Sequence, residues 1–167
     1  MPQTMQVGRV HGSGTPSVAI QGWKYSGGTW AIGAVMTINA GLAQEAAATP
    51  VANILGIALQ AVDTNLGFGA ANSPLQVTGR KSTVSVAMAN SRTIFRGSLV
   101  NNSAVVVAPQ DSDVGTKYGV SKQGGVWCVD KNLTGANGCV IVVGYNLTTP
   151  DGGFVFFQFV ASTLALP

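Results

Sequence analysis

The chain has 167 residues and a formal net charge of +3; 46% of its residues are hydrophobic, only 9% are charged and 22 are glycine. Ordinary soluble domains carry about 25% charged residues, and this shortage excludes coiled coils and helical bundles, which are rich in Glu, Lys and Arg. The high hydrophobic content and low net charge exclude a disordered chain. There is no cluster of basic residues and no apolar stretch of about 18 residues, so we expect neither nucleic-acid binding nor a membrane span.

Turn-forming residues punctuate the chain about every ten positions, which is the spacing typical of β-sandwiches and barrels. The expected strands are residues 17–23, 32–38, 53–60, 75–77, 83–89, 93–100, 116–120, 126–130, 139–145 and 154–160. We therefore predict an all-β, compact single-domain fold, a β-barrel or sandwich-like arrangement of short strands with at most one short helix. Residues 1–16 are expected to form a flexible N-terminal arm, and residues 17–167 the β-rich domain.

Three local features interrupt the strand pattern. Residues 42–48 form the only stretch with strong helix propensity, but they are too few for a stable isolated helix, and a single helical turn or a loop fits equally well. Gly56 lies inside an apolar run, where a glycine indicates a β-bulge or the close approach of another backbone. Gly97 is expected to break the strand at residues 93–100.

The last third of the chain predicts a hairpin whose strands are apolar on both faces. Turn-forming residues at 150–153 separate residues 140–144 from residues 154–160. Residues 83–89, by contrast, alternate in the way that a strand with one buried face does. A strand that is apolar on both faces must be covered on both, and we expect a neighbouring subunit to provide the second cover. The candidate residues for this oligomer interface are Val142, Phe154, Phe156, Phe157 and Phe159.

Residues able to carry catalysis or to bind a metal are few and scattered. His11 is the only histidine, and no acid beside it would orient it for nucleophilic catalysis. Asp111-Ser112-Asp113 resembles the start of a calcium loop but lacks the third ligand, so a solvated turn is the favoured interpretation. Cys128 and Cys139 could face each other on a hairpin; two buried thiols are favoured over a disulfide, although the spacing permits both. We therefore predict that the protein is not an enzyme and has no catalytic, cofactor or metal site.

The chain also carries an ordered series of short motifs built from glycine, alanine and β-branched residues. The series begins with Ile-Gly-Ala-Val and ends with Gly-Phe-Val-Phe-Phe. Its members occupy residues 32–35, 39–41, 54–58, 84–90, 93–97, 115–119, 127–130, 140–144 and 153–157. In order and spacing, over about residues 30–160, the series resembles the head decoration, or cement, proteins of tailed bacteriophages.

This resemblance implies a structural virion protein made in the cytoplasm of a bacterial host. It implies a homotrimer on the capsid exterior, at threefold or quasi-threefold positions, which stabilises the head by bridging subunits of the major capsid protein. We expect the N-terminal arm to contact that coat protein by adding a strand to an exposed sheet edge. The candidate capsid-contact residues are Met5, Val7, Arg9, Val10 and His11.

An alternative of a different class is a trimeric carbohydrate- or receptor-binding module of a phage fibre. The aromatic residues would then form a stacking platform, with Trp and Tyr exposed on one rim. The favoured interpretation of the same aromatic residues is that they fill the core and the subunit interface.

Overall fold

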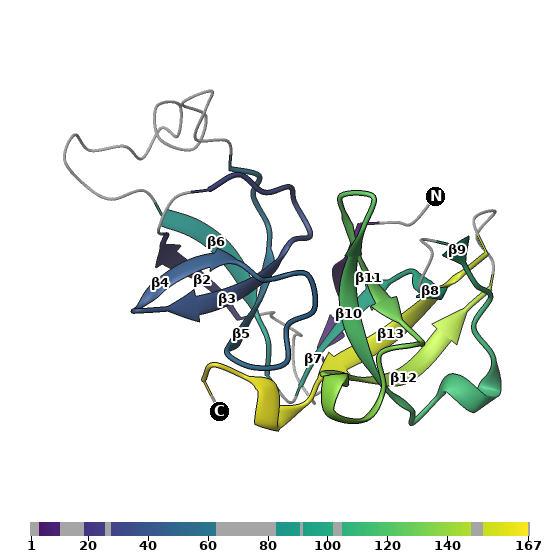
Figure 1. The fold of residues 1–167 in the computed structure, drawn as a ribbon. Helices are drawn as coiled ribbons and strands as arrows, with labels where there is room; N and C mark the ends of the chain where they lie inside the picture. The colour runs from purple at the N-terminus through teal and green to yellow at the C-terminus, as the bar shows by residue number, and fades with distance from the viewer. Residues whose placement is uncertain are drawn as a thin grey trace.

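Two β-sheets make up the part of the chain that the computed structural model describes, residues 4–10, 19–25, 28–62, 83–90, 92–101, 105–147 and 152–166 (Figure 1). The predicted all-β class is confirmed, and the helical residues described are confined to three single 3-10 turns, η1 (Asp111–Asp113), η2 (Gly135–Asn137) and η3 (Ala161–Thr163). Within the described residues neither sheet closes into a barrel, and the arrangement is compatible with a β-sandwich. The predicted strand at residues 75–77 lies outside the described residues.

The smaller sheet has five strands, all antiparallel. In spatial order they are β2 (Ile20–Lys24), β6 (Thr83–Met88), β5 (Ile54–Ala58), β3 (Val35–Asn39) and β4 (Leu42–Glu45). A single bridge between Tyr25 and Ala43 brings the two edges of this sheet together. The central strand β5 is buried along its whole length.

The helix-prone stretch at residues 42–48 forms a strand where we expected a helical turn or a loop. Ala40 and Gly41 both have positive φ angles, +48° and +77°, and make a two-residue turn that folds Leu42–Glu45 back onto β3. Ala43 is then fully buried in the core. Pairing and burial override the local propensity, which is only a weak preference.

Gly56 confirms the predicted irregularity in β5. The register of β3 against β5 shifts at this point, because Met36 pairs with Gly56 while Thr37 pairs with Ile54. Gly56 has a φ of +152°, and a Cβ atom there would lie 2.0 Å from the carbonyl oxygen of Ala87 on β6. The position therefore accepts only glycine without displacing the neighbouring strand.

The larger sheet has eight strands. In spatial order they are β1 (Gln6–Val10), β7 (Thr93–Gly97), β13 (Phe154–Phe159), β12 (Val140–Asn146), β10 (Lys117–Gln123), β11 (Val126–Asp130), β8 (Leu99–Asn101) and β9 (Val105–Val106). Among the described strands of this sheet, only the β11–β8 pair is parallel. The predicted hairpin of the last third is confirmed as the antiparallel pair β12–β13, and β7 ends at Gly97 as expected. Of the predicted turn residues 150–153, Pro150 and Asp151 lie outside the described residues.

This sheet curls around its own apolar side chains. One residue, Ser98, separates β7 from β8, so the same stretch of chain borders β13 at one end and β11 at the other. The rings of Phe157 and Phe159 lie 5.9 Å and 5.5 Å from that of Phe95 inside the curl. The core continues from there into the smaller sheet.

The two cysteines are not opposite each other, because β10 lies between β11 and β12. Cys128 belongs to β11 and Cys139 precedes β12, and both are buried free thiols. Burial raises the pKa of Cys128 to about 12 and that of Cys139 to about 11. A thiol that stays protonated is a poor nucleophile, so both act as small apolar core residues.

The described part of the N-terminal segment is anchored and not a free arm. Gln6–Val10 pairs with β7 as an edge strand of the larger sheet. Met5 is only 1% exposed, and a Cβ on Gly97 would lie 3.2 Å from its Cγ. A buried methionine of this kind contributes to folding through its apolar surface, which explains why the segment packs down.

Candidate interaction surface

The candidate interaction surface is the outward face of the larger sheet, over β10, β12, β13 and β7. Directly opposite residues of an antiparallel pair point to the same side, and the register gives two outward rows. One row is Lys117, Ile141 and Gln158, and the other is Gly144, Phe156 and Arg96. We call this surface the outer face; its side chains are those of Arg96, Lys117, Ile141, Val143, Phe156 and Gln158.

The centre of the outer face is apolar and open to solvent. Along β12 the side chains alternate: Val140 and Val142 are fully buried, whereas Ile141 and Val143 are 38% and 40% exposed. A register shift beside Val143 marks an irregularity opposite β13. An antiparallel sheet with one buried face normally carries polar residues on the other. Ile141 and Val143 depart from this pattern, which makes the outer face a candidate surface for contact with another molecule.

One end of the outer face carries an aromatic and cationic cluster. The guanidinium carbon of Arg96 lies 5.4 Å from the ring centroid of Phe154, which meets Phe156 edge to face at 5.1 Å. The Nε of Arg96 donates a hydrogen bond of 2.8 Å to the side-chain oxygen of Gln6 on β1. These contacts hold the charge of Arg96 at the edge of the apolar centre.

The structure buries most of the predicted oligomer-interface residues within this chain. Val142 and Phe157 are fully buried, Phe159 is 3% exposed and Phe154 is 7% exposed. The remaining residue of the set, Phe156, is half-buried and lies on the outer face. A side chain with no accessible surface has nothing to offer a second subunit. Ile141 and Val143 were not predicted as exposed residues, because the strand at residues 140–144 is apolar on both faces and its sequence does not show which face points inward.

The predicted capsid-contact residues that the structure describes do not lie on a free arm. Met5 lies in the core, so it does not reach a partner in this conformation. Val7, Arg9 and Val10 belong to β1, where they pair with Phe95, Ile94 and Thr93 of β7. His11 lies outside the described residues.

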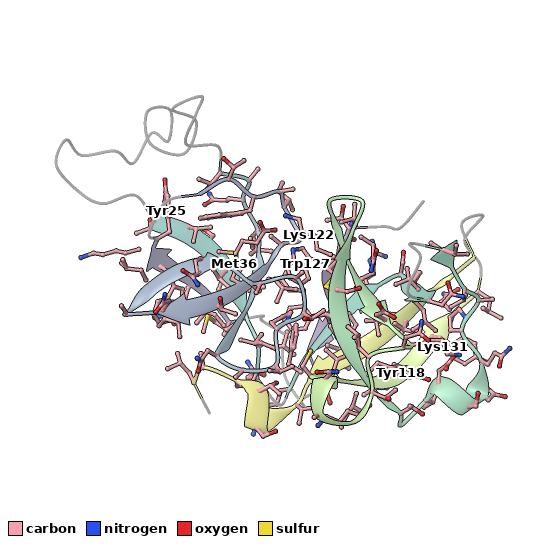
Figure 2. All side chains as sticks on the ribbon, viewed as in Figure 1. Tyr25, Met36, Tyr118, Lys122, Trp127 and Lys131 are labelled. Atoms are coloured by element: carbon pink, nitrogen blue, oxygen red, sulfur yellow. The ribbon has the colours of Figure 1, made fainter. Side chains whose placement is uncertain are left out.

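Asp113 is the centre of a buried polar cluster at the η1 turn. Its side chain is 1% exposed. Its Oδ1 accepts hydrogen bonds from the Tyr118 hydroxyl at 2.7 Å and from the Lys131 ammonium at 2.8 Å. Its Oδ2 accepts a hydrogen bond from the backbone N–H of Gln110 at 2.8 Å. Tyr118 and Lys131 lie side by side in Figure 2. With this donor set, Asp113 acts as an internal anchor and not as the start of a calcium site.

The same donors determine the ionisation of the cluster. Burial raises the pKa of Asp113, but the hydrogen bonds from Lys131, Tyr118 and Gln110 outweigh burial and hold it below its ordinary value of 3.8. Because the folded-state pKa is lowered, the ionised carboxylate stabilises the fold above about pH 4, and this contribution is lost as the pH falls through the lowered value. Burial, with Asp113 beside it, raises the pKa of Tyr118 to about 12.

Glu45 links the two sheets. Its Oε1 accepts a hydrogen bond from the Lys122 ammonium at 2.7 Å and another from the Trp127 indole at 2.9 Å, so β4 is tied to β10 and β11. Figure 2 shows Lys122 and Trp127 where the sheets meet. The cavity beside Glu45 has a volume of about 30 Å³. That volume holds about one water molecule, so the cavity is too small for a substrate.

The tryptophan and tyrosine side chains form no exposed rim. Trp30, Trp127 and Tyr118 are 3%, 2% and 6% exposed. Trp23, Tyr25 and Tyr145 are partly buried and pack against the core. The fibre-module alternative needs such a rim, and these positions do not favour it.

Other routes to a function give little guidance. Among the described residues there is no group of three or more His, Cys, Asp and Glu side chains that could hold a metal ion. In the same part of the chain, no helix has the length and apolar character that crossing a membrane requires. Comparisons with family models, with curated proteins and with solved structures find no match. A functional assignment therefore rests on the outer face and on the motif series.

Proposed function

We propose that the protein is a structural component of a phage virion that binds the outer surface of the capsid. In this proposal it sits as a trimer at threefold or quasi-threefold positions and stabilises the shell by bridging coat subunits. The observation that carries the proposal is the outer face, whose centre presents Ile141 and Val143 to solvent. Exposed apolar residues on the face of a sheet suit contact with another protein, whereas a small-molecule site is normally concave.

The motif series and the low charge content support the same function. The motifs resemble those of phage head decoration proteins in order and spacing, and they include the strands β5, β7 and β12. A chain with 9% charged residues has few groups to desolvate when it is covered by a partner. Burial of apolar surface then contributes about 25 cal/mol per Å², from which the entropic cost of association is subtracted.

The mechanism of stabilisation would be mechanical. A bound copy that touches two coat subunits adds its interfacial free energy to the contact between them, because the subunits cannot separate without losing it. The packed rings around Phe95 and the link between the sheets through Glu45 are the contacts that would transmit that restraint.

The proposal is tested by mixing the purified protein with expanded, undecorated capsids and measuring co-sedimentation and the temperature at which the shells open. We expect saturable binding and a higher opening temperature. Val143→Asp should abolish both, because it places a charge at the centre of the outer face. Ile20→Asp, a matched change at a 61% exposed position of β2, should leave both unchanged. Absence of saturable binding by the unaltered protein would contradict the proposal.

A further inference from the structure

Resting on this proposed function, we infer that the outer face docks on a coat-protein surface whose apolar side chains are flanked by carboxylates. A second copy of this chain does not cover this face. Copies in the proposed trimer meet through another part of the surface. The inference follows from the distribution of charge around the apolar centre.

Two cations border the apolar centre. Lys117 is exposed and lies directly across from Ile141 in the β10–β12 pair. Arg96 lies directly across from Phe156 in the β7–β13 pair. The ion pairs of the described residues are Lys122–Glu45 and Lys131–Asp113, so neither Lys117 nor Arg96 is neutralised within the described part of this chain. Within this chain Arg96 contacts two uncharged groups, the side chain of Gln6 and the ring of Phe154.

The carboxylates of the described residues are mostly occupied inside the molecule. Glu45 bonds to Lys122 and Trp127, and Asp113 is saturated by its three donors. Asp130 is 2% exposed and accepts hydrogen bonds from the Ser121 hydroxyl at 3.0 Å and from the backbone N–H of Asn132 at 3.0 Å. Asp111 is exposed, but it already accepts the Tyr145 hydroxyl at 2.7 Å.

This distribution of charge disfavours a second copy of the chain on the outer face, whether the copies meet about a twofold or a threefold axis. A twofold contact between two outer faces would bring Lys117 and Arg96 of one copy close to the same cations of the other, and like charges at an interface cost free energy. A contact around a threefold axis would need an acidic surface elsewhere on the chain, and the described surface offers the single carboxylate of Asp111 for it. An acidic partner of different sequence satisfies both the apolar centre and the cationic border.

The test uses expanded, undecorated capsids and a charge reversal at the border of the outer face. Lys117→Glu should weaken capsid binding on the order of tenfold, and added salt should weaken binding of the unaltered protein, since both changes act on charge complementarity. Lys24→Glu makes the same charge change at an exposed position of β2 on the other sheet and should change affinity less than about twofold. Thermal melting of each variant alone shows whether the fold is intact.

The outcomes separate this inference from the proposed function. If the unaltered protein binds capsids and Lys117→Glu binds equally well, the inference is overturned while the proposed function stands. If the unaltered protein does not bind capsids, both are overturned. Sedimentation velocity provides a second check: an oligomer that Val143→Asp converts to folded monomers would show that copies of this chain cover the outer face, which also overturns the inference.

Discussion

Neighbouring residues on strands β10, β12 and β13 occupy opposite environments, although several are chemically alike. Phe157 is fully buried against Phe95, while Phe156 is half-buried on the outer face. Val142 is fully buried, while Val143 is 40% exposed. Residue type alone therefore does not tell whether an apolar side chain is buried in the core or exposed on the outer face. The side of the strand decides it.

The two faces should therefore respond differently to substitution. Loss of an inward side chain leaves a cavity in a packed core and lowers the free energy of unfolding. Loss of an outward side chain leaves the isolated fold nearly unchanged and acts only when the surface is covered. Matched pairs on the same strand separate the two effects.

The largest difference is expected for the phenylalanine pair of β13. Phe157→Ala should lower the free energy of unfolding by about 3–5 kcal/mol, because it leaves a cavity beside the rings of Phe95 and Phe159. Phe156→Ala should lower it by about 1 kcal/mol, since the ring is only partly covered. Urea unfolding followed by circular dichroism measures both. Equal losses would mean that the outer face is packed as tightly as the core.

An intermediate difference is expected for the adjacent residues Tyr118 and Lys117 of β10. Tyr118→Phe removes the hydroxyl that donates to Asp113 at 2.7 Å and should cost about 1.5–3 kcal/mol, the range for a hydrogen bond to a charged group. Lys117→Gln removes an exposed charge and should change the stability by less than about 0.5 kcal/mol. The same urea experiment at neutral pH compares them.

The Tyr118→Phe variant should also unfold at a higher pH when acid is added. The hydroxyl helps to hold the pKa of Asp113 below 3.8, so its loss raises that pKa. The stabilisation by the ionised carboxylate is then lost earlier as the pH falls. An unchanged acid transition would show that Lys131 and Gln110 hold the carboxylate without help from Tyr118.

Much of this architecture was predictable from the sequence. Turn spacing and β-branched runs gave the all-β class, most strand positions and the β12–β13 hairpin. Gly56 was predicted to mark an irregularity because a glycine inside a strand usually marks a bulge or a close backbone approach. The close approach of the Ala87 backbone explains why a glycine is needed there. These features depend on local chemistry, which the sequence displays directly.

The remaining features depend on contacts between distant segments. Residues 42–48 favour a helix locally, but the burial of Ala43 and the contact of Glu45 with Lys122 keep the segment extended. The insertion of β10 between β11 and β12, which separates Cys128 from Cys139, has no local signal. The outer face was half predicted: a second cover was expected over the last two strands, but the residues assigned to it were mostly those that the core already covers.

The smallest difference is expected for the two adjacent valines of β12, which share a residue type and a strand but differ in burial. Val142→Ala removes two buried methyl groups and should lower the free energy of unfolding by about 1.5 kcal/mol, at roughly 0.8 kcal/mol for each group. Val143→Ala should lower it by less than about 0.5 kcal/mol. Thermal and urea unfolding of the two variants measure the difference. If Val143→Ala cost as much as Val142→Ala, the outer face would already be covered within a single chain and would not be available to a coat protein.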